Sequence, residues 1–373
     1  MQFRDLKKQY EVLKEDIDKA MIEVAASSQY INGPAVKELE KELCEYVGVK
    51  HCITCANGTD ALTMAMMAWD IGPGDAVFVP DFTFFSSGEI ISHVGATPVF
   101  VDVDKETFNV DTRSLIEAIE AVRAERKLTL AAIVAVDLFG LPANFTEIKK
   151  IAQEYDLLLL EDGAQGFGGS INGKKACSFG DISTTSFFPA KPLGCYGDGG
   201  AVFTDDDEIA DKLRSIRVHG KGEMKYDNVR IGLNSRLDTI QAAILQVKLK
   251  AFKNYELEAV NKVASQYTDM LKNICHIPQV KDGFYSSWAQ YTIRLRNKAD
   301  RDTLQKHLKD ARIPSMVYYP KPMHMQQAFD GSRAYVDYKN TELLVDTVLS
   351  LPMHPYMTEE DITKVVDVIK LYL

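Results

Sequence analysis

The sequence predicts an α/β fold: a mostly parallel central sheet with helices on both faces, followed by a smaller C-terminal α/β domain. Short apolar runs alternate with amphipathic segments over residues 48–205, which is the pattern of successive β–α–β units. The run from Ala131 to Val136 is continuously apolar, as expected of a strand covered on both faces. Of the 373 residues, 46% are hydrophobic and 26% charged, which is typical of a globular chain long enough for two domains.

Periodicity and turn residues locate the elements in chain order. Apolar residues at helical spacing predict an amphipathic helix within residues 1–30, and a second helix from Val36 to Val47 ends at Gly48. Strands are predicted over residues 51–56, 76–80, 98–103, 131–137, 156–161 and 201–204, with helices over 61–69, 86–94, 114–125, 145–155 and 208–218.

A long helix from Thr239 to about Val263 is predicted to lead from a large domain, residues 1–250, into a small domain, residues 251–373. The small domain is expected to contain a strand over residues 289–295, a helix over 300–310 and a final helix over 359–372. Between the two predicted helices of this domain, Tyr318 and Tyr319 begin a loop stiffened by prolines, which could border a substrate pocket or form a packed turn.

Composition disfavours several classes of function. The net charge is −10 and no Lys/Arg-rich face stands out, so we expect no nucleic-acid binding. The first residues are charged and no stretch of about 18 apolar residues occurs, so we expect a cytoplasmic protein with no membrane span. Cys52 and Cys55 have C-x-x-C spacing but lie in an apolar run, which predicts buried side chains rather than a metal site.

The residues from Ser183 to Gly200 suggest covalent chemistry. A run of β-forming residues ends at Pro189, and Lys191 follows in a glycine-rich turn. Behind an apolar strand this lysine would be desolvated, which lowers the pKa of its ammonium group and makes the amine a nucleophile toward carbonyls. Lys191 is therefore a candidate Schiff-base lysine for pyridoxal 5′-phosphate (PLP), with a surface lysine in a glycine-rich loop as the alternative.

Other turns follow predicted strands and could hold further parts of such a cofactor. Gly58, Thr59 and Asp60 begin a helix, where free N–H groups could bind a phosphate or where the turn could simply cap the helix. Asp162 ends an apolar strand, where a carboxylate could hold a protonated pyridine nitrogen or anchor a loop. Phe84 could stack on a flat ring or belong to the core.

Asn234 and Arg236 precede the long helix and offer an amide and a guanidinium group, which suit phosphate or carboxylate, although Arg236 could equally serve the helix N-terminus. The signatures of dinucleotide-binding domains, serine hydrolases, zinc proteases and P-loop enzymes do not occur in the sequence.

Five motifs follow one another in the order found in a single enzyme family. They are Gly58-Thr-Asp-Ala-Leu, Thr83-Phe84, Glu161-Asp-Gly-Ala-Gln165, Ser186-Phe-Phe-Pro-Ala-Lys191 and Gly232-Leu-Asn-Ser-Arg-Leu-Asp238. Together they resemble the DegT-type nucleotide-sugar aminotransferases, which are PLP enzymes of fold type I, over essentially the whole chain. One departure is Gly163, where many members carry alanine.

The resemblance implies roles for these residues. Lys191 forms the Schiff base with PLP and moves the proton during transamination, whereas the family's dehydratases carry histidine in its place. Asp162 pairs with the pyridinium nitrogen, Gln165 lies near the ring oxygen and Phe84 stacks on the ring. The phosphate is implied to bind Thr59, Asp60, Ser186 and, from the neighbouring subunit of a homodimer, Asn234, with Gly58 in the same cofactor-binding turn.

The segment around Lys191 most resembles the subgroup that aminates C3 of UDP-2-acetamido-2-deoxy-3-oxo-glucuronate, with L-glutamate as donor, for O-antigen synthesis. A uronate carries a carboxylate, for which Arg236 is the expected partner, with Tyr318 and Tyr319 contributing from the small domain. The alternatives are a 3-keto- or 4-keto-6-deoxy sugar nucleotide as substrate, a non-catalytic regulatory protein of the same fold, and an NAD-dependent sugar enzyme, which the absent dinucleotide fingerprint disfavours.

Overall fold

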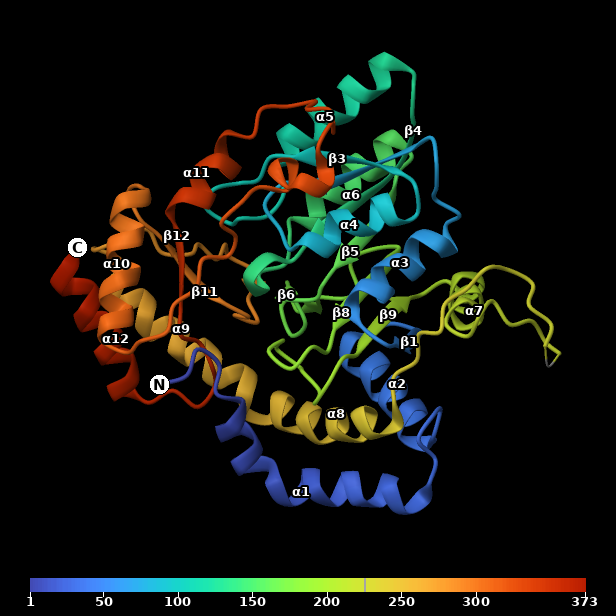
Figure 1. Cartoon of the computed structure of the whole chain (residues 1–373), viewed down its shortest axis with the longest axis horizontal. Coiled ribbons are helices and arrows are strands. Elements are labelled where there is room, and N and C mark those ends of the chain that lie inside the picture. The colour runs from blue at the N-terminus through green and yellow to red at the C-terminus, as the bar shows by residue number, and fades with distance from the viewer. Residues whose placement is uncertain (225) are drawn as a thin grey trace.

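The computed structural model describes residues 1–224 and 226–373 and has a seven-stranded sheet at its centre (Figure 1). The strand order is β1-β9-β8-β5-β4-β2-β3. Neighbours from β3 to β8 pair in parallel, and β9 runs antiparallel to both β8 and β1. The predicted α/β class with a mostly parallel sheet is confirmed. The strands are β1 (His51–Cys55), β2 (Asp75–Pro80), β3 (Thr97–Val101), β4 (Thr129–Val136), β5 (Leu158–Asp162), β8 (Ile182–Ser186) and β9 (Gly200–Thr204).

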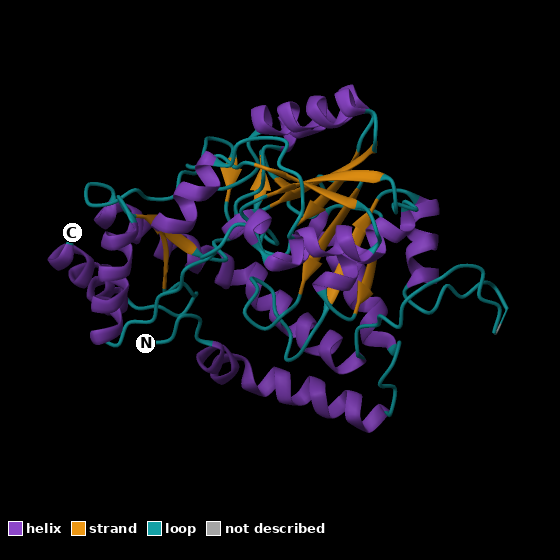
Figure 2. Ribbon diagram, turned by 45° about the horizontal axis from the view of Figure 1, so that its top comes forward, coloured by secondary structure: helices purple, strands orange, loops and turns teal. Residues whose placement is uncertain are grey.

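The central strands are buried on both faces because successive side chains point in opposite directions. In β2, Val77 and Val79 belong to a hydrophobic cluster on one face of the sheet, and Phe78 belongs to a second cluster on the opposite face. Helices α3 (Gly58–Ala68), α4 (Phe85–His93) and α7 (Asp207–Ile216) cover the first face, while α5 (Thr112–Glu125) and α6 (Phe145–Tyr155) cover the second (Figure 2).

A further layer is formed by α1 (Leu6–Ser27), α2 (Pro34–Val47) and α8 (Thr239–Ala251), with α8 packed against both other helices (Figure 1). The predicted long helix extends farther than expected, because α8 continues through a π-helical turn at Phe252–Glu256 into α9 (Leu257–Leu271). Among the described residues, we find no helix with both the length and the apolar character needed to cross a bilayer.

The C-terminal part has its own hydrophobic cluster around a two-stranded antiparallel sheet of β11 (Tyr291–Arg294) and β12 (Val348–Leu351). Helices α9, α10 (Lys298–Asp310) and α12 (Glu359–Tyr372) contribute to this cluster. The division of the chain at residue 250 stays a prediction. The remaining elements are α11 (Lys339–Thr347), a small sheet of β10 (Phe284–Tyr285), β6 (Ser170–Ile171) and β7 (Lys174–Lys175), and short helical turns at Leu138–Gly140, Met323–Met325 and Gln327–Phe329.

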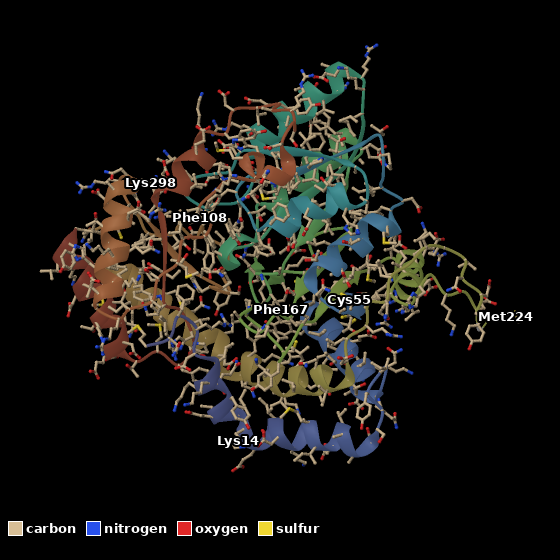
Figure 3. The ribbon with its side chains drawn as sticks, viewed as in Figure 1. Lys14, Cys55, Phe108, Phe167, Met224 and Lys298 are labelled. Atoms are coloured by element: carbon tan, nitrogen blue, oxygen red, sulfur yellow. The ribbon has the colours of Figure 1, made fainter. Side chains whose placement is uncertain are left out.

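The two cysteines with C-x-x-C spacing are both buried in β1, as predicted. Cys55 packs in the cluster on the first face of the sheet, and Cys52 packs in a separate cluster with α2 and α8 (Figure 3 labels Cys55). The spacing therefore reflects packing on two faces of a strand.

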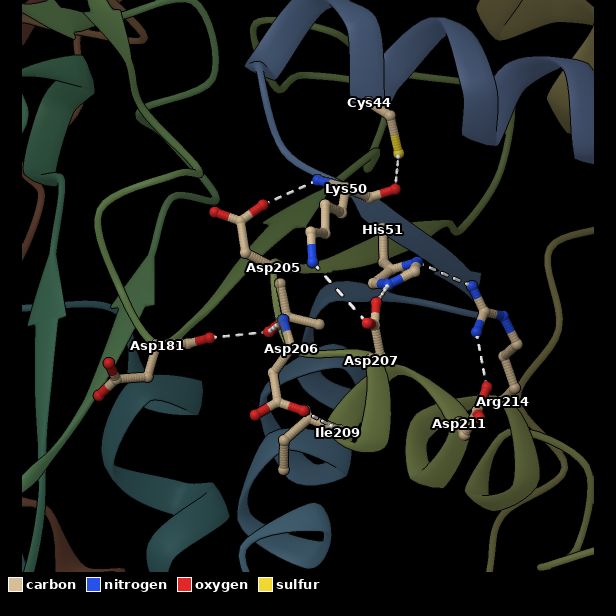
Figure 4. A network of polar contacts seen from close by, with 11 residues as sticks. Cys44, Lys50, His51, Asp181, Asp205, Asp206, Asp207, Ile209, Asp211 and Arg214 are labelled. Atoms are coloured by element: carbon tan, nitrogen blue, oxygen red, sulfur yellow. Dashed lines mark hydrogen bonds and ion pairs between the residues drawn. The ribbon is translucent and has the colours of Figure 1, made fainter.

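A polar network joins β1 to α7 at the amino end of β1 (Figure 4). His51 Nε2 lies 2.7 Å from Asp207 Oδ1, and Arg214 Nη1 donates to Asp211 Oδ1 at 2.9 Å. Asp207 is 75% exposed, so solvent screens these pairs and each contributes little to stability. The network ties α7 to the sheet edge opposite the carboxyl ends of the parallel strands.

Candidate active site

A cavity of about 710 Å³ lies at the carboxyl ends of the parallel strands. Ligands of open α/β sheets bind at this edge, where the loops after several strands converge. Polar residues from the loops after β1, β2, β5 and β8 face it, together with aromatic residues from the segment after α10. The predicted residues that line this cavity are Gly58, Thr59, Phe84, Asp162, Gln165, Ser186, Lys191, Tyr318 and Tyr319.

Three predicted residues do not line the cavity. Asp60 lies in the first turn of α3, where its backbone N–H donates to the capping side chain of Asn57 at 2.8 Å. Asn234 is exposed and Arg236 is half-buried on the segment that precedes α8. Neither residue lines the cavity, so the contacts predicted for Asn234 and Arg236 stay predictions.

Lys191 lies in a compact turn between β8 and β9. Its N–H donates to the carbonyl oxygen of Phe188 at 2.9 Å, and its Nζ lies 5.9 Å from the centroid of the Phe84 ring. Burial lowers the pKa of the Lys191 ammonium group, while the Asp162 carboxylate acts in the opposite direction. A lowered pKa increases the fraction of neutral amine, which is the form that attacks carbonyls.

The adjacent carboxylates at the end of β5 point to opposite sides of the strand. Asp162 lines the cavity, and its Oδ2 accepts a hydrogen bond from Ser87 Oγ at 2.7 Å. Glu161 is fully buried and accepts from the N–H groups of Cys177 and Phe179, each at 2.6 Å, and from Ser183 Oγ at 2.7 Å. Glu161 is thus a loop anchor, and Asp162 is the carboxylate available to a ligand.

The N-terminus of α3 lies against the end of β8. A Cβ atom at Gly58 would lie 2.7 Å from Ser186 Cβ, so glycine is required for this approach. Thr59 Oγ1 lies 2.8 Å from Ser86 Oγ beside the same helix end. Hydroxyl groups and free N–H groups at a helix N-terminus suit a phosphate.

Aromatic side chains and an amide form another part of the wall. Gln165 Oε1 accepts from the Phe139 N–H at 2.7 Å, and its Nε2 donates to Tyr319 Oη at 3.0 Å, which fixes the amide orientation. Phe84 is 52% exposed although it lines the cavity, so its ring is accessible to a flat ligand. Burial raises the pKa of the Tyr319 hydroxyl, which therefore stays protonated and able to donate.

Sequence reasoning missed Ser87, Ser86 and Asn57. Asn57 caps α3 just after β1, and Ser86 and Ser87 lie in the first turn of α4, the helix that follows β2. The signal was available in the Ser86-Ser87 pair, since two hydroxyls at the start of a helix behind a buried strand are able to face the sheet edge.

The match to known families settles where the chain belongs. Residues 11–370 match the DegT/DnrJ/EryC1/StrS aminotransferase family. The chain is a member of this family. The resemblance inferred from the five sequence motifs is therefore confirmed, and with it the class of PLP-dependent sugar aminotransferases.

Similar proteins cover the chain almost completely. It is 44% identical over 358 residues to the UDP-2-acetamido-2-deoxy-3-oxo-D-glucuronate aminotransferase of Pseudomonas aeruginosa, covering 96% of each chain. It is 42% identical over 372 residues to a protein of Geobacillus stearothermophilus named pleiotropic regulatory protein, covering 97% and 96%. A crystal structure of a family aminotransferase from Brucella abortus superposes with a TM-score of 0.97 at 48% identity, covering 100% and 99%.

Gly163, the departure from the family pattern, has a local explanation. A Cβ atom at this position would lie 2.6 Å from Cys177 Sγ and 3.0 Å from the carbonyl oxygen of Thr184. We expect Gly163→Ala to lower the free energy of unfolding by about 1–3 kcal/mol, measured by urea denaturation. Adding Cys177→Ala should recover part of the loss because it removes the sulfur. Unchanged stability of Gly163→Ala would contradict this explanation.

Proposed function

We propose that this protein transfers an amino group from L-glutamate to C3 of UDP-2-acetamido-2-deoxy-3-oxo-glucuronate, using PLP, in the cytoplasm and for surface-polysaccharide synthesis. The observation that carries the proposal is the partly buried Lys191 amine in the same cavity as Asp162. The similarity to the Pseudomonas aeruginosa enzyme supports the choice of substrate.

The residues of the cavity fit PLP. The N-terminus of α3 with Gly58, Thr59 and Ser186 would hold the phosphate, and Asp162 would hold the pyridine nitrogen in its protonated form. Phe84 would cover one face of the ring, and Gln165 would lie near the ring oxygen. When bound, PLP supplies an electron sink that stabilises negative charge on a neighbouring carbon.

Lys191 has two tasks in this proposal. Its amine would hold the cofactor between turnovers, which the lowered pKa favours. After its release, Lys191 Nζ would act as general base and acid, moving a proton to the sugar carbon that receives the amino group. The 2.7 Å hydrogen bond from Ser87 Oγ would keep the Asp162 carboxylate in the orientation that holds the pyridine nitrogen.

A homodimer would complete the site. Asn234 would reach the phosphate of the neighbouring subunit, and Arg236 would pair with the uronate carboxylate, with Tyr318 and Tyr319 contributing from the cavity wall. The segment between α7 and α8 projects from the body, and Met224 lies near its tip (Figure 3). Met224 is 74% exposed and Ile231 86%, so this segment offers apolar surface to another subunit.

A regulatory role is the second candidate, because a relative of comparable identity is named a pleiotropic regulatory protein. Lys191 and Asp162 in one cavity favour catalysis, since a binding protein has no need of an amine whose pKa is lowered by burial in the same cavity as a carboxylate.

A spectral titration of the purified protein with PLP tests the proposal. We expect L-glutamate to bleach the visible absorption of the bound cofactor and the 3-oxo-uronate nucleotide to restore it. Restoration by a 4-keto-6-deoxy sugar nucleotide alone would keep the aminotransferase and reassign its substrate. No spectral change with glutamate and any keto-sugar nucleotide, despite bound PLP, would favour the regulatory candidate.

A further inference from the structure

Arg4 contacts the backbone of the Lys191 turn from the N-terminal segment. Its Nη2 donates to the carbonyl oxygen of Lys191 at 2.8 Å and to that of Pro192 at 3.3 Å. Within residues 1–224 and 226–373, we find no other hydrogen bond to either carbonyl. The proposed reaction assigns no task to Arg4.

The turn depends on contacts from outside to fix these two carbonyls. Pro192 has no N–H group, so it cannot contribute a backbone donor to the turn. Gly194 lies so close to Pro189 that a Cβ there would be 2.5 Å from the Pro189 carbonyl oxygen, which shows how tightly the turn is folded. A lysine amine is placed by its own Cα, so movement of residues 191 and 192 moves Nζ relative to Asp162.

Contacts on both sides of Arg4 hold it in place. The Phe3 carbonyl oxygen accepts from the Met353 N–H at 3.1 Å, and the Phe3 ring meets the Tyr318 ring edge-on at 6.1 Å between centroids. Asp5 caps α1 by accepting from the Lys8 N–H at 2.8 Å. We call residues 3–5 the N-terminal strap. It links the C-terminal part, the cavity wall and α1 to the turn that carries Lys191.

The charge of Arg4 agrees with this arrangement. Burial lowers the pKa of its guanidinium to about 10, with Glu256 opposing the change, so it stays cationic near neutral pH. Glu256 is buried and accepts hydrogen bonds from Gln9 Nε2 at 2.8 Å and Tyr356 Oη at 2.5 Å. Burial has the largest effect on the pKa of the Lys191 ammonium group and lowers it, and the positive charge of Arg4 lowers it further.

We propose that Arg4 is a positioning residue for Lys191, holding the turn through its two carbonyls so that the amine stays directed into the cavity. The inference deepens the proposed function and rests on the role assigned there to Lys191. Arg4 acts through the backbone and need not touch cofactor or substrate.

The test compares Arg4→Met with Arg4→Lys and with Lys7→Met, an exposed lysine on α1 that serves as the matched control. In cofactor-free protein, we expect Arg4→Met to speed hydrogen–deuterium exchange across residues 187–199 by about tenfold, because both carbonyl groups of the turn lose their donor. In the holoenzyme, kcat should fall about 10- to 100-fold while KM for the nucleotide sugar stays within about twofold. Arg4→Lys keeps a cationic donor and should recover part of both effects.

The outcomes separate this inference from the proposed function. Unchanged exchange in both Arg4 variants, or a raised KM with unchanged kcat, would overturn the positioning role even in an active aminotransferase. If the wild-type protein shows no transamination but Arg4→Met still speeds hydrogen–deuterium exchange, the proposed function is wrong. The role of Arg4 in holding the turn is then retained. If Arg4→Met does not fold, the Arg4→Lys comparison with Lys7→Met gives the same decision.

Discussion

Replacing Lys191 by alanine is expected to reduce transamination by more than about 10⁴-fold, because one side chain supplies both the nucleophilic amine and the proton transfer. The measurement is the rate of the half-reaction with L-glutamate, followed by the absorption of bound PLP. Stability should change little, since the partly buried ammonium has no salt bridge among the described residues and its removal leaves no partner unsatisfied.

The control for this experiment is Lys19→Ala. Lys19 lies on α1 and pairs at 3.9 Å with Glu23, and the two side chains are 74% and 66% exposed. This variant should retain full activity and the same melting temperature. Appreciable turnover in Lys191→Ala, with the fold intact by circular dichroism, would remove Lys191 from the mechanism.

Asp162→Asn is expected to lower kcat by about 10²- to 10³-fold with little loss of stability. A neutral amide does not stabilise a protonated pyridine nitrogen, so the ring withdraws electrons less strongly and the barrier to proton transfer rises. The Asn oxygen can still accept from the Ala164 N–H, which lies 3.2 Å from Asp162 Oδ1, and the amide nitrogen can donate to the Ser87 hydroxyl, which accepts as well as donates, so the local structure should survive. Single-turnover kinetics with L-glutamate and thermal unfolding measure the two quantities.

Glu161→Gln is the matched comparison one residue away. Its side chain accepts from two backbone N–H groups and the Ser183 hydroxyl, and an amide nitrogen would face one or more of these donors. We expect the free energy of unfolding to fall by about 1–3 kcal/mol while kcat of the folded protein stays within a few-fold of wild type. If Asp162→Asn destabilised the protein and spared kcat, the assignment of the two carboxylates would be wrong.

Much of the large sheet is predictable because its buried strands are continuous apolar runs and the segments between them have helical periodicity. The predicted strands at 76–80 and 131–137 and the helices at 114–125 and 145–155 lie close to the observed β2, β4, α5 and α6. The C-terminal part is less predictable. Helix α11 passes directly into β12 at Val348 with no glycine or proline between them, so no turn residue signals the change.

The site residues also divide into those that the local sequence predicts and those that it does not. Gly58, Asp162 and Lys191 are predictable because each lies at or soon after the end of a buried strand, and the strand end fixes its position. The hydrogen bonds that Ser87 and Arg4 make are not predictable, because their partners lie 75 and 187 residues away along the chain. Local patterns carry no information about such pairings until the chain is folded.

The alternation along β5 has an evolutionary consequence. Under the proposed function, selection for folding would act on Glu161 and selection for turnover would act on Asp162, so two neighbouring codons would be under different selection. A point mutation at one codon should therefore impair one of the two functions and leave the other almost unchanged. An insertion or deletion of a single codon within β5 would exchange the two carboxylates between faces and eliminate both functions at once. We therefore expect homologous proteins to tolerate substitutions near β5 but not changes in the length of this strand.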